Sequence, residues 1–133
     1  MKKNYFLLIA ALFGMLAVIL GAFGAHGLEK LLDEKMLQRF HTGVEYQFYH
    51  SFALGLVGLL LQHASHAWYT KAAYAFIFGI ILFSGSLYIY VLTGITKFGM
   101  ITPFGGLAFI VGLAFIVGWA CLAWGSWKAE AAS

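Results

Sequence analysis

The sequence predicts an all-α integral membrane protein, with four transmembrane helices in an up-and-down bundle. Hydrophobic residues make up 62% of the 133 residues and charged residues only 10%, whereas a soluble domain has about 25% charged residues. The apolar residues gather in four stretches of about 20 residues, which is the length of helix that crosses a hydrocarbon core. This composition excludes a soluble monomer. The single cysteine, Cys121, excludes a disulfide scaffold.

The four expected spans follow one another in a single domain that covers residues 1–133. Their ranges are 5–25, 43–61, 72–92 and 103–124. None shows the period-two alternation of a transmembrane β-strand, so each is interpreted as a helix. The first stretch is longer than the apolar region of a signal peptide, and we expect it to be retained. The short connections favour antiparallel neighbours and therefore an up-and-down bundle.

A short amphipathic helix is expected between the first and second spans. From Leu28 to Phe40 the apolar residues follow helical spacing, and charged residues occupy most of the other positions. Such a helix would lie in the membrane interface, with its apolar side on lipid or on the bundle. The alternative is that this segment is a helical extension of the second span.

The orientation in the membrane is predicted from the position of the first basic residues. Lysine and arginine residues are equally numerous on the two faces that this topology creates, but Lys2 and Lys3 come directly before the first span. The first helix usually dominates insertion, so we expect both termini in the cytoplasm. No block of basic residues indicates binding to nucleic acid.

Polar residues of the four spans are expected to meet in one half of the bundle. Ionisable groups inside a membrane are costly, so they mark candidate functional positions. The predicted cluster consists of His26, Glu45, Tyr46, Gln47, His50, Ser84, Ser86, Tyr88 and Thr102. It has two interpretations, namely a proton relay or polar pocket, and a set of hydrogen bonds that hold the helices together. We favour the second, because interhelical hydrogen bonds commonly act as weak glue.

Helical geometry separates the two ionisable groups of the second span. Glu45 and His50 are about 140° apart around a helix, so they need not touch each other. Each is expected to find a partner on another helix or another protomer. The expected partners of Glu45 are His41, His26 or a loop residue. The expected partners of His50 are Ser84, Ser86 or Thr102.

Small residues recur at helical spacing and predict close helix packing. They are Ala17, Gly21, Ala25, Gly55, Ala114 and Gly118. Rows of this kind let helix backbones approach each other, either within a bundle or between protomers. Together with the large apolar surface, they predict a homo-oligomer that contacts membrane lipids.

Four short motifs resemble the marks of one known family. They cover residues 21–26 (GAFGAH), 42–50 (TGVEYQFYH), 83–88 (FSGSLY) and 102–106 (TPFGG). The resemblance is to the small bacterial membrane proteins catalogued as domain of unknown function 423, which have eukaryotic relatives in the transmembrane protein 256 group. It implies a four-helix protein of the bacterial inner (plasma) membrane. It implies no reaction, because the family has no established biochemical activity.

The function that best fits these observations is non-enzymatic support of membrane or envelope integrity, through oligomerisation or lipid contacts. The spans offer no complete set of nucleophile, base and orienting group, and no metal or cofactor is expected. One alternative is a small proton-coupled transporter or channel that uses Glu45 and His50. Another is a protein that binds lipid, quinone or haem near the extracytoplasmic interface, where His26 and His50 are the conceivable haem ligands.

Overall fold

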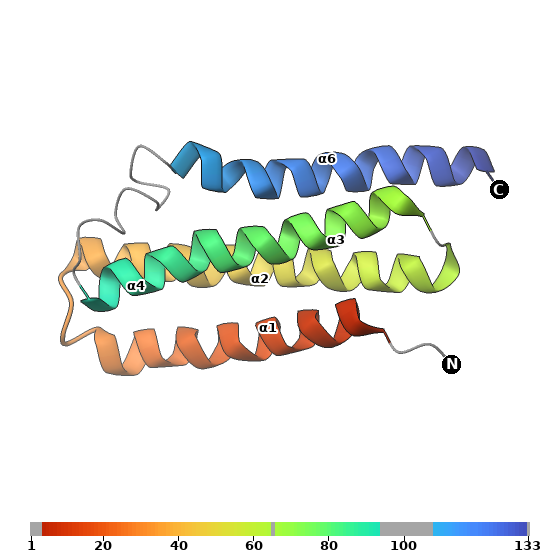
Figure 1. The fold of residues 1–133 in the computed structure, drawn as a ribbon. Coiled ribbons are helices and arrows are strands. Elements are labelled where there is room, and N and C mark those ends of the chain that lie inside the picture. Colours follow the sequence, from red (N-terminus) through yellow and green to blue (C-terminus); the bar gives the residue numbers. More distant parts are fainter. Residues whose placement is uncertain (1–3, 65, 94–107, 133) are drawn as a thin grey trace.

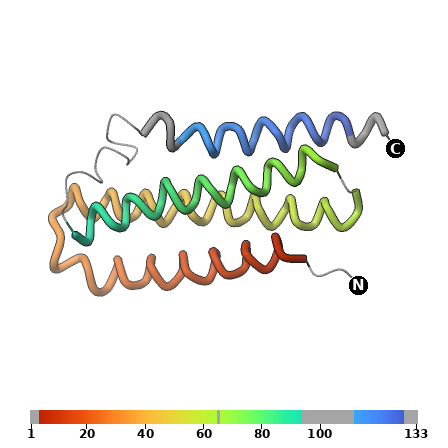
Figure 2. Tube along the Cα trace, in the orientation of Figure 1, coloured from red at the N-terminus to blue at the C-terminus, as the bar shows by residue number. Residues whose placement is uncertain are grey.

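The computed structural model describes residues 4–64, 66–93 and 108–132, and every regular element among them is helical (Figure 1). The long helical rods lie side by side and alternate in direction, as the chain trace also shows (Figure 2). The rods are α1 (Tyr5–Phe23) with the π-helical turn η1 (Gly24–Leu28), α2 (Glu34–His63), α3 (Ala67–Gly79) with η2 (Ile80–Ser84) and α4 (Gly85–Thr93), and α6 (Ala108–Ala132). The prediction of a helical fold with four long helices is confirmed for the residues that the structure describes.

Two of the rods are long and apolar enough to cross a membrane by themselves, when only the described residues are considered. They are Tyr5–Leu28 and Ala67–Thr93, which contain the expected spans 5–25 and 72–92. The helix α2 contains the expected span 43–61 but begins at Glu34. The helix α6 contains the described part of the expected span 103–124 and continues to Ala132. Positions 103–107 lie outside the described residues.

The separate amphipathic helix expected between the first two spans is not formed. The chain turns after Leu28, and α2 begins at Glu34. Asp33 starts this helix, since its Oδ1 accepts a hydrogen bond from the Met36 N–H at 2.8 Å, as an N-cap residue does. No proline or glycine follows before Gly43, so the helix runs on without a break. Residues 34–40 are therefore the helical extension that the sequence left as the alternative.

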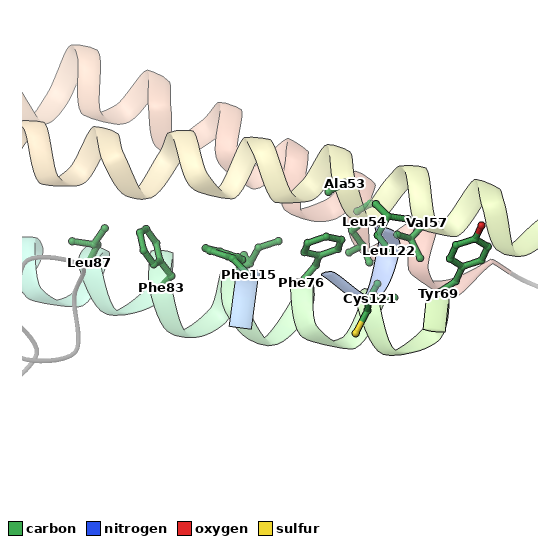
Figure 3. Close-up of a cluster of buried hydrophobic side chains, with 14 residues drawn as sticks. Ala53, Leu54, Val57, Tyr69, Phe76, Phe83, Leu87, Phe115, Cys121 and Leu122 are labelled. Carbon is green, nitrogen blue, oxygen red and sulfur yellow. The ribbon is translucent and has the colours of Figure 1, made fainter. Parts of the chain in front are cut away.

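The main apolar core lies between α2, α3 and α6 (Figure 3). Leu54 and Val57 of α2 and Phe76 of α3 are fully buried there, and Phe115 of α6 packs between Phe76 and Phe83 in this view. The helix α1 contributes little to it, because only Ala10 and Ala17 of that helix are buried. Only 11% of the apolar window of the α1 rod is buried, so most of its surface is left to face lipid or a partner.

Glycines let the helices α3 and α6 approach closely. The ring of Phe76 lies against Gly118, where a Cβ would come within 2.6 Å of it, and the ring of Phe115 lies against Gly79 in the same way. Each helix thus places an aromatic ring over a glycine of the other. The sequence predicted a packing role for Gly118 but did not single out Gly79.

The remaining small residues of the predicted packing rows have mixed positions. Ala17 is fully buried, and Gly21 faces Val44 across the contact between α1 and α2. Gly55 faces Ala10 of α1. Ala25 is exposed and Ala114 is half-buried, so these two are not part of a tight contact inside the described chain.

Candidate functional site

The contacts between α1 and α2 show how far along the bundle each polar residue of α2 lies. A Cβ on Gly21 would lie 3.4 Å from Val44 Cγ1, and a Cβ on Gly58 would lie 3.1 Å from the Leu7 nitrogen. In this antiparallel register His50 is level with the region of Met15, near the middle of the α1 rod. The sequence predicted that His50 would lie in one half of the bundle, with the other polar residues of the cluster. The difference arises because α2 begins at Glu34, nine residues before the expected start at residue 43.

Gln47 is the centre of a hydrogen-bond network that joins three helices. Its side chain is 2% exposed. Its Nε2 donates to the Phe13 carbonyl of α1 at 2.7 Å, and its Oε1 accepts from the Tyr88 hydroxyl of α4 at 2.7 Å. The hydroxyl of Ser51 donates to the Gln47 carbonyl at 2.5 Å. One amide side chain on α2 therefore links α1 and α4.

The two serines of the third span bind backbone carbonyls. The Ser84 hydroxyl donates to the Gly43 carbonyl of α2 at 2.7 Å, which adds a second link between these rods. The Ser86 hydroxyl donates to the Phe83 carbonyl of its own rod at 3.0 Å. Ser84 belongs to the π-helical turn η2. The expectation that Ser84 or Ser86 would be the partner of His50 was therefore wrong.

His50 lies in a cage of aromatic rings and is 5% exposed. Its ring stacks on Phe115, with 3.5 Å between the centroids and 10° between the planes. Tyr46 and Phe76 lie 6.1 Å and 5.7 Å from its centroid. The ring nitrogens have different partners: Nδ1 is 2.8 Å from the Tyr46 carbonyl, and Nε2 is 3.1 Å from the indole nitrogen of Trp119.

These partners assign the proton of the imidazole. A carbonyl only accepts hydrogen bonds and an indole N–H only donates them. His50 must therefore carry its proton on Nδ1 and accept at Nε2, so it is the neutral tautomer. A proton on Nε2 would face the Trp119 N–H and break that bond. To ligate haem through either nitrogen, His50 would have to give up one of these two bonds.

The structure does not bring His26 or Glu45 into this network. Both side chains are exposed. Within the described part of the chain, the Glu45 carboxylate has no hydrogen-bond or ion-pair partner. His26 and His41, which the sequence suggested as its partners, therefore do not bond to it. Thr102 lies outside the described residues. No group of three His, Cys, Asp or Glu among the described side chains is placed to hold a metal ion.

Sequence reasoning missed several polar links between helices. The Arg39 guanidinium of α2, for example, donates to the Tyr90 hydroxyl of α4 at 2.7 Å, and two further links are informative. One is the Trp119 indole, which was taken only as part of an apolar span. The other is Asn4, whose Nδ2 donates to the Gly58 carbonyl at 3.0 Å while its Oδ1 caps the Leu7 N–H at 3.0 Å. An asparagine directly before an apolar run is an N-cap signal, so its role at the start of α1 could have been found. Its second bond to α2 depends on tertiary packing.

These features define a helical bundle with an apolar outer surface and a hydrogen-bonded polar interior. Its helices carry large apolar side chains on their outer faces, and its interior polar groups bond to one another. The chain belongs to the family described as protein of unknown function (DUF423), whose model matches residues 20–106. The family resemblance seen in the sequence is thereby confirmed.

Curated bacterial relatives extend this finding. The chain is 48% identical over 97 residues to the UPF0382 membrane protein YwdK of Bacillus subtilis. The aligned region covers 72% of this chain and 79% of the relative. It is 44% identical over 87 residues to a UPF0382 membrane protein of Haemophilus influenzae, covering 65% and 68% of the two chains. It is 36% identical over 88 residues to the UPF0382 inner membrane protein YgdD of Escherichia coli, covering 66% and 67%. No solved structure matches the chain.

Proposed function

We propose that this chain is a non-enzymatic, multi-pass protein of the bacterial inner membrane that supports envelope integrity through oligomerisation and lipid contacts. One observation carries the proposal. Among the described residues, no buried side-chain nitrogen or oxygen lacks a hydrogen-bond partner. A relay or binding pocket needs polar groups that are free to exchange partners, whereas a network saturated by its own chain holds helices together.

In this proposal all four helical rods cross the membrane. The α1 rod and the α3–α4 rod have the length and apolarity to do so. The helix α2 packs along both, and α6 packs along α3. The alternation of the rods supports both termini on one side of the membrane, and Lys2 and Lys3 favour the cytoplasm for that side. The name of the Escherichia coli relative supports the inner membrane.

The outer surface supports a role in lipid or protomer contacts. Large apolar side chains are exposed on every rod, and examples are Val18 of α1, Phe52 of α2, Phe78 of α3 and Ile116 of α6. Lys71 and Lys128 lie over the rings of Trp68 and Trp124 at the end of the molecule where the termini lie. Tryptophan and lysine are typical anchors at a membrane interface.

A deletion strain tests this function. We expect cells that lack the protein to admit more of a membrane-impermeant dye and to tolerate detergent less well than the parent strain. Expression of the native chain should restore both properties. The variant Gly118→Leu, which disturbs the contact between α3 and α6, should not restore them, whereas Gly112→Leu should. Unchanged permeability and tolerance in the deletion strain would contradict the proposal.

The two alternative functions have less support. A proton path through Glu45 and His50 would have to connect an exposed carboxylate with a caged imidazole on another side of α2. Two aromatic residues that a ligand pocket could use already have partners in this chain: Tyr46 stacks on Phe83 at 4.6 Å, and the Tyr88 hydroxyl binds Gln47. Proton flux into liposomes that is lost in a Glu45→Gln, His50→Ala double variant would favour the transporter over our proposal.

A further inference from the structure

Two lysines stand on neighbouring helices at the end of the molecule where the termini lie. Lys71 belongs to the first turns of α3 and Lys128 to the last turns of α6, and both are exposed. The two helices are antiparallel, so the start of α3 lies beside the end of α6 (Figure 1). A Cβ on Gly125 would come within 3.1 Å of the Trp68 Cβ, which fixes this register. The lysines therefore belong to the same end of one helix–helix contact.

Both lysines lie on the side of the α3–α6 pair that faces away from α2. On α6, Lys128 is nine residues from Trp119, or about 180° around the helix, and Trp119 bonds to His50 of α2. On α3, Lys71 is five residues from Phe76, or about 140° around the helix, and the ring of Phe76 lies 5.7 Å from that of His50. The contact between α3 and α6 lies between these directions on each helix.

The two ammonium groups are held at similar depth. Lys71 starts two residues deeper than Tyr69, which faces Gly125, and its Nζ reaches back over the ring of Trp68, 4.2 Å from the centroid. Lys128 starts three residues beyond Gly125, and its Nζ reaches inward over the ring of Trp124, 5.1 Å from the centroid. Both charges are thus drawn toward the level of Gly125. We call Trp68, Lys71, Trp124 and Lys128 the lysine–tryptophan cluster.

The described part of the chain supplies no anion to this cluster. Neither lysine has a hydrogen bond or ion pair with a described residue. Four of the five acids lie in the other half of the molecule, and they are Glu29, Asp33, Glu34 and Glu45. The fifth, Glu130, is two residues after Lys128 and so falls on the opposite side of α6 in helical projection. The partner of the two ammonium groups must come from outside the described chain.

We propose that the lysine–tryptophan cluster binds the phosphate group of an anionic phospholipid. Phosphate is the anion that the membrane interface offers, and basic residues between membrane helices on the cytoplasmic side bind such headgroups. A zwitterionic headgroup carries its own cation, which the two lysines repel. Phe78 lies seven residues after Lys71 on the same side of α3 and is 58% exposed, so it offers apolar surface to the acyl chains. The inference rests on the lipid contacts in the proposed function and names the lipid class and the site.

Lipid binding to the purified protein in detergent micelles tests this site. Phosphatidylglycerol with brominated acyl chains is the probe, and its binding is followed by quenching of tryptophan fluorescence. We expect the double variant Lys71→Gln, Lys128→Gln to weaken binding by about ten-fold or more. Lys30→Gln, Lys35→Gln is the matched control, because it removes the same charge from exposed positions at the other end. Equal affinities in the two double variants would overturn the proposal.

Three further measurements define the ligand. Phosphatidylethanolamine with the same acyl chains should bind the native chain about ten-fold more weakly or less, and equal affinity for the two lipids would overturn the selection of an anionic headgroup. Lys71→Arg, Lys128→Arg keeps both charges and should keep the affinity, and a loss as large as in the glutamine variant would overturn the role of charge. Inorganic phosphate in excess should not displace the lipid, and displacement would show a site for the free anion instead.

These experiments separate the inference from the proposed function. Equal lipid binding in all variants, in a protein whose deletion raises permeability, would remove the site and leave the role in envelope integrity. Selective binding that depends on Lys71 and Lys128, in a protein whose deletion leaves permeability unchanged, would remove that role and leave the site.

Discussion

Single residues near the middle of the rods connect the helices, and each does so through defined atoms. Gln47 uses its amide to reach α1 and α4, and His50 uses its two nitrogens to bind a carbonyl of α2 and the indole of α6. A hydrogen bond buried among apolar groups contributes modestly when made, but its loss leaves a polar atom unsatisfied at a cost of about 1–3 kcal/mol. These residues therefore matter most when one partner is removed.

The tautomer of His50 is a prediction at this scale. Because Nδ1 must donate to the Tyr46 carbonyl and Nε2 must accept from Trp119, ¹⁵N NMR of labelled histidine should show a protonated Nδ1 and an unprotonated Nε2. In Trp119→Phe the donor to Nε2 disappears, and the Nε2 resonance should shift. A protonated Nε2 in the native chain would contradict the assigned contact.

Contacts between whole helices depend on where glycines stand. The helices α3 and α6 interlock because Gly118 and Gly79 each receive a phenylalanine ring from the other helix. In a membrane, where apolar side chains gain little by leaving lipid, such close approach is a main source of helix association. The contact therefore holds α6 to the rest of the chain.

A prediction at the element scale uses two glycines of the same helix. Gly118→Leu forces a side chain into the ring of Phe76 and should lower the free energy of unfolding by about 1–3 kcal/mol, the usual cost of overpacking. Gly112→Leu is the control, since nothing lies within 4 Å of a Cβ at that position. Thermal unfolding in detergent micelles measures both. Equal melting temperatures for the two variants would contradict the packing of α3 on α6.

The helices of the whole molecule could be predicted from the sequence because their apolar runs are long and continuous. The start of α2 could not be predicted, because the charged residues around Glu34 are equally compatible with a loop and with a surface helix. The sequence predicted that Gln47 and Tyr88 would belong to the polar cluster. The sequence did not predict which polar side chains bond to each other. The contact of His50 with Trp119, for example, depends on how two helices that are distant in the sequence are rotated against each other. The outward position of Glu45 was missed for the same reason.

The topology of the whole molecule gives a further prediction. Alkaline phosphatase fused at Leu31, in the turn between α1 and α2, should be active, because this enzyme folds only outside the cytoplasm. The same enzyme fused after Lys128 should be inactive, and a fluorescent protein there should mature. Active phosphatase at both sites would show an even number of crossings between them, whereas the three rods α2, α3–α4 and α6 predict an odd number.

The central claim is that polar residues inside the molecule hold its helices together. A double-mutant cycle on Gln47 and Tyr88 tests it most directly, with Gln47→Leu, Tyr88→Phe and the double variant unfolded reversibly in mixed micelles. We predict a coupling of about 0.5–2 kcal/mol, the range known for hydrogen bonds between membrane helices. A coupling of zero, with both single variants as stable as the native chain, would contradict the claim.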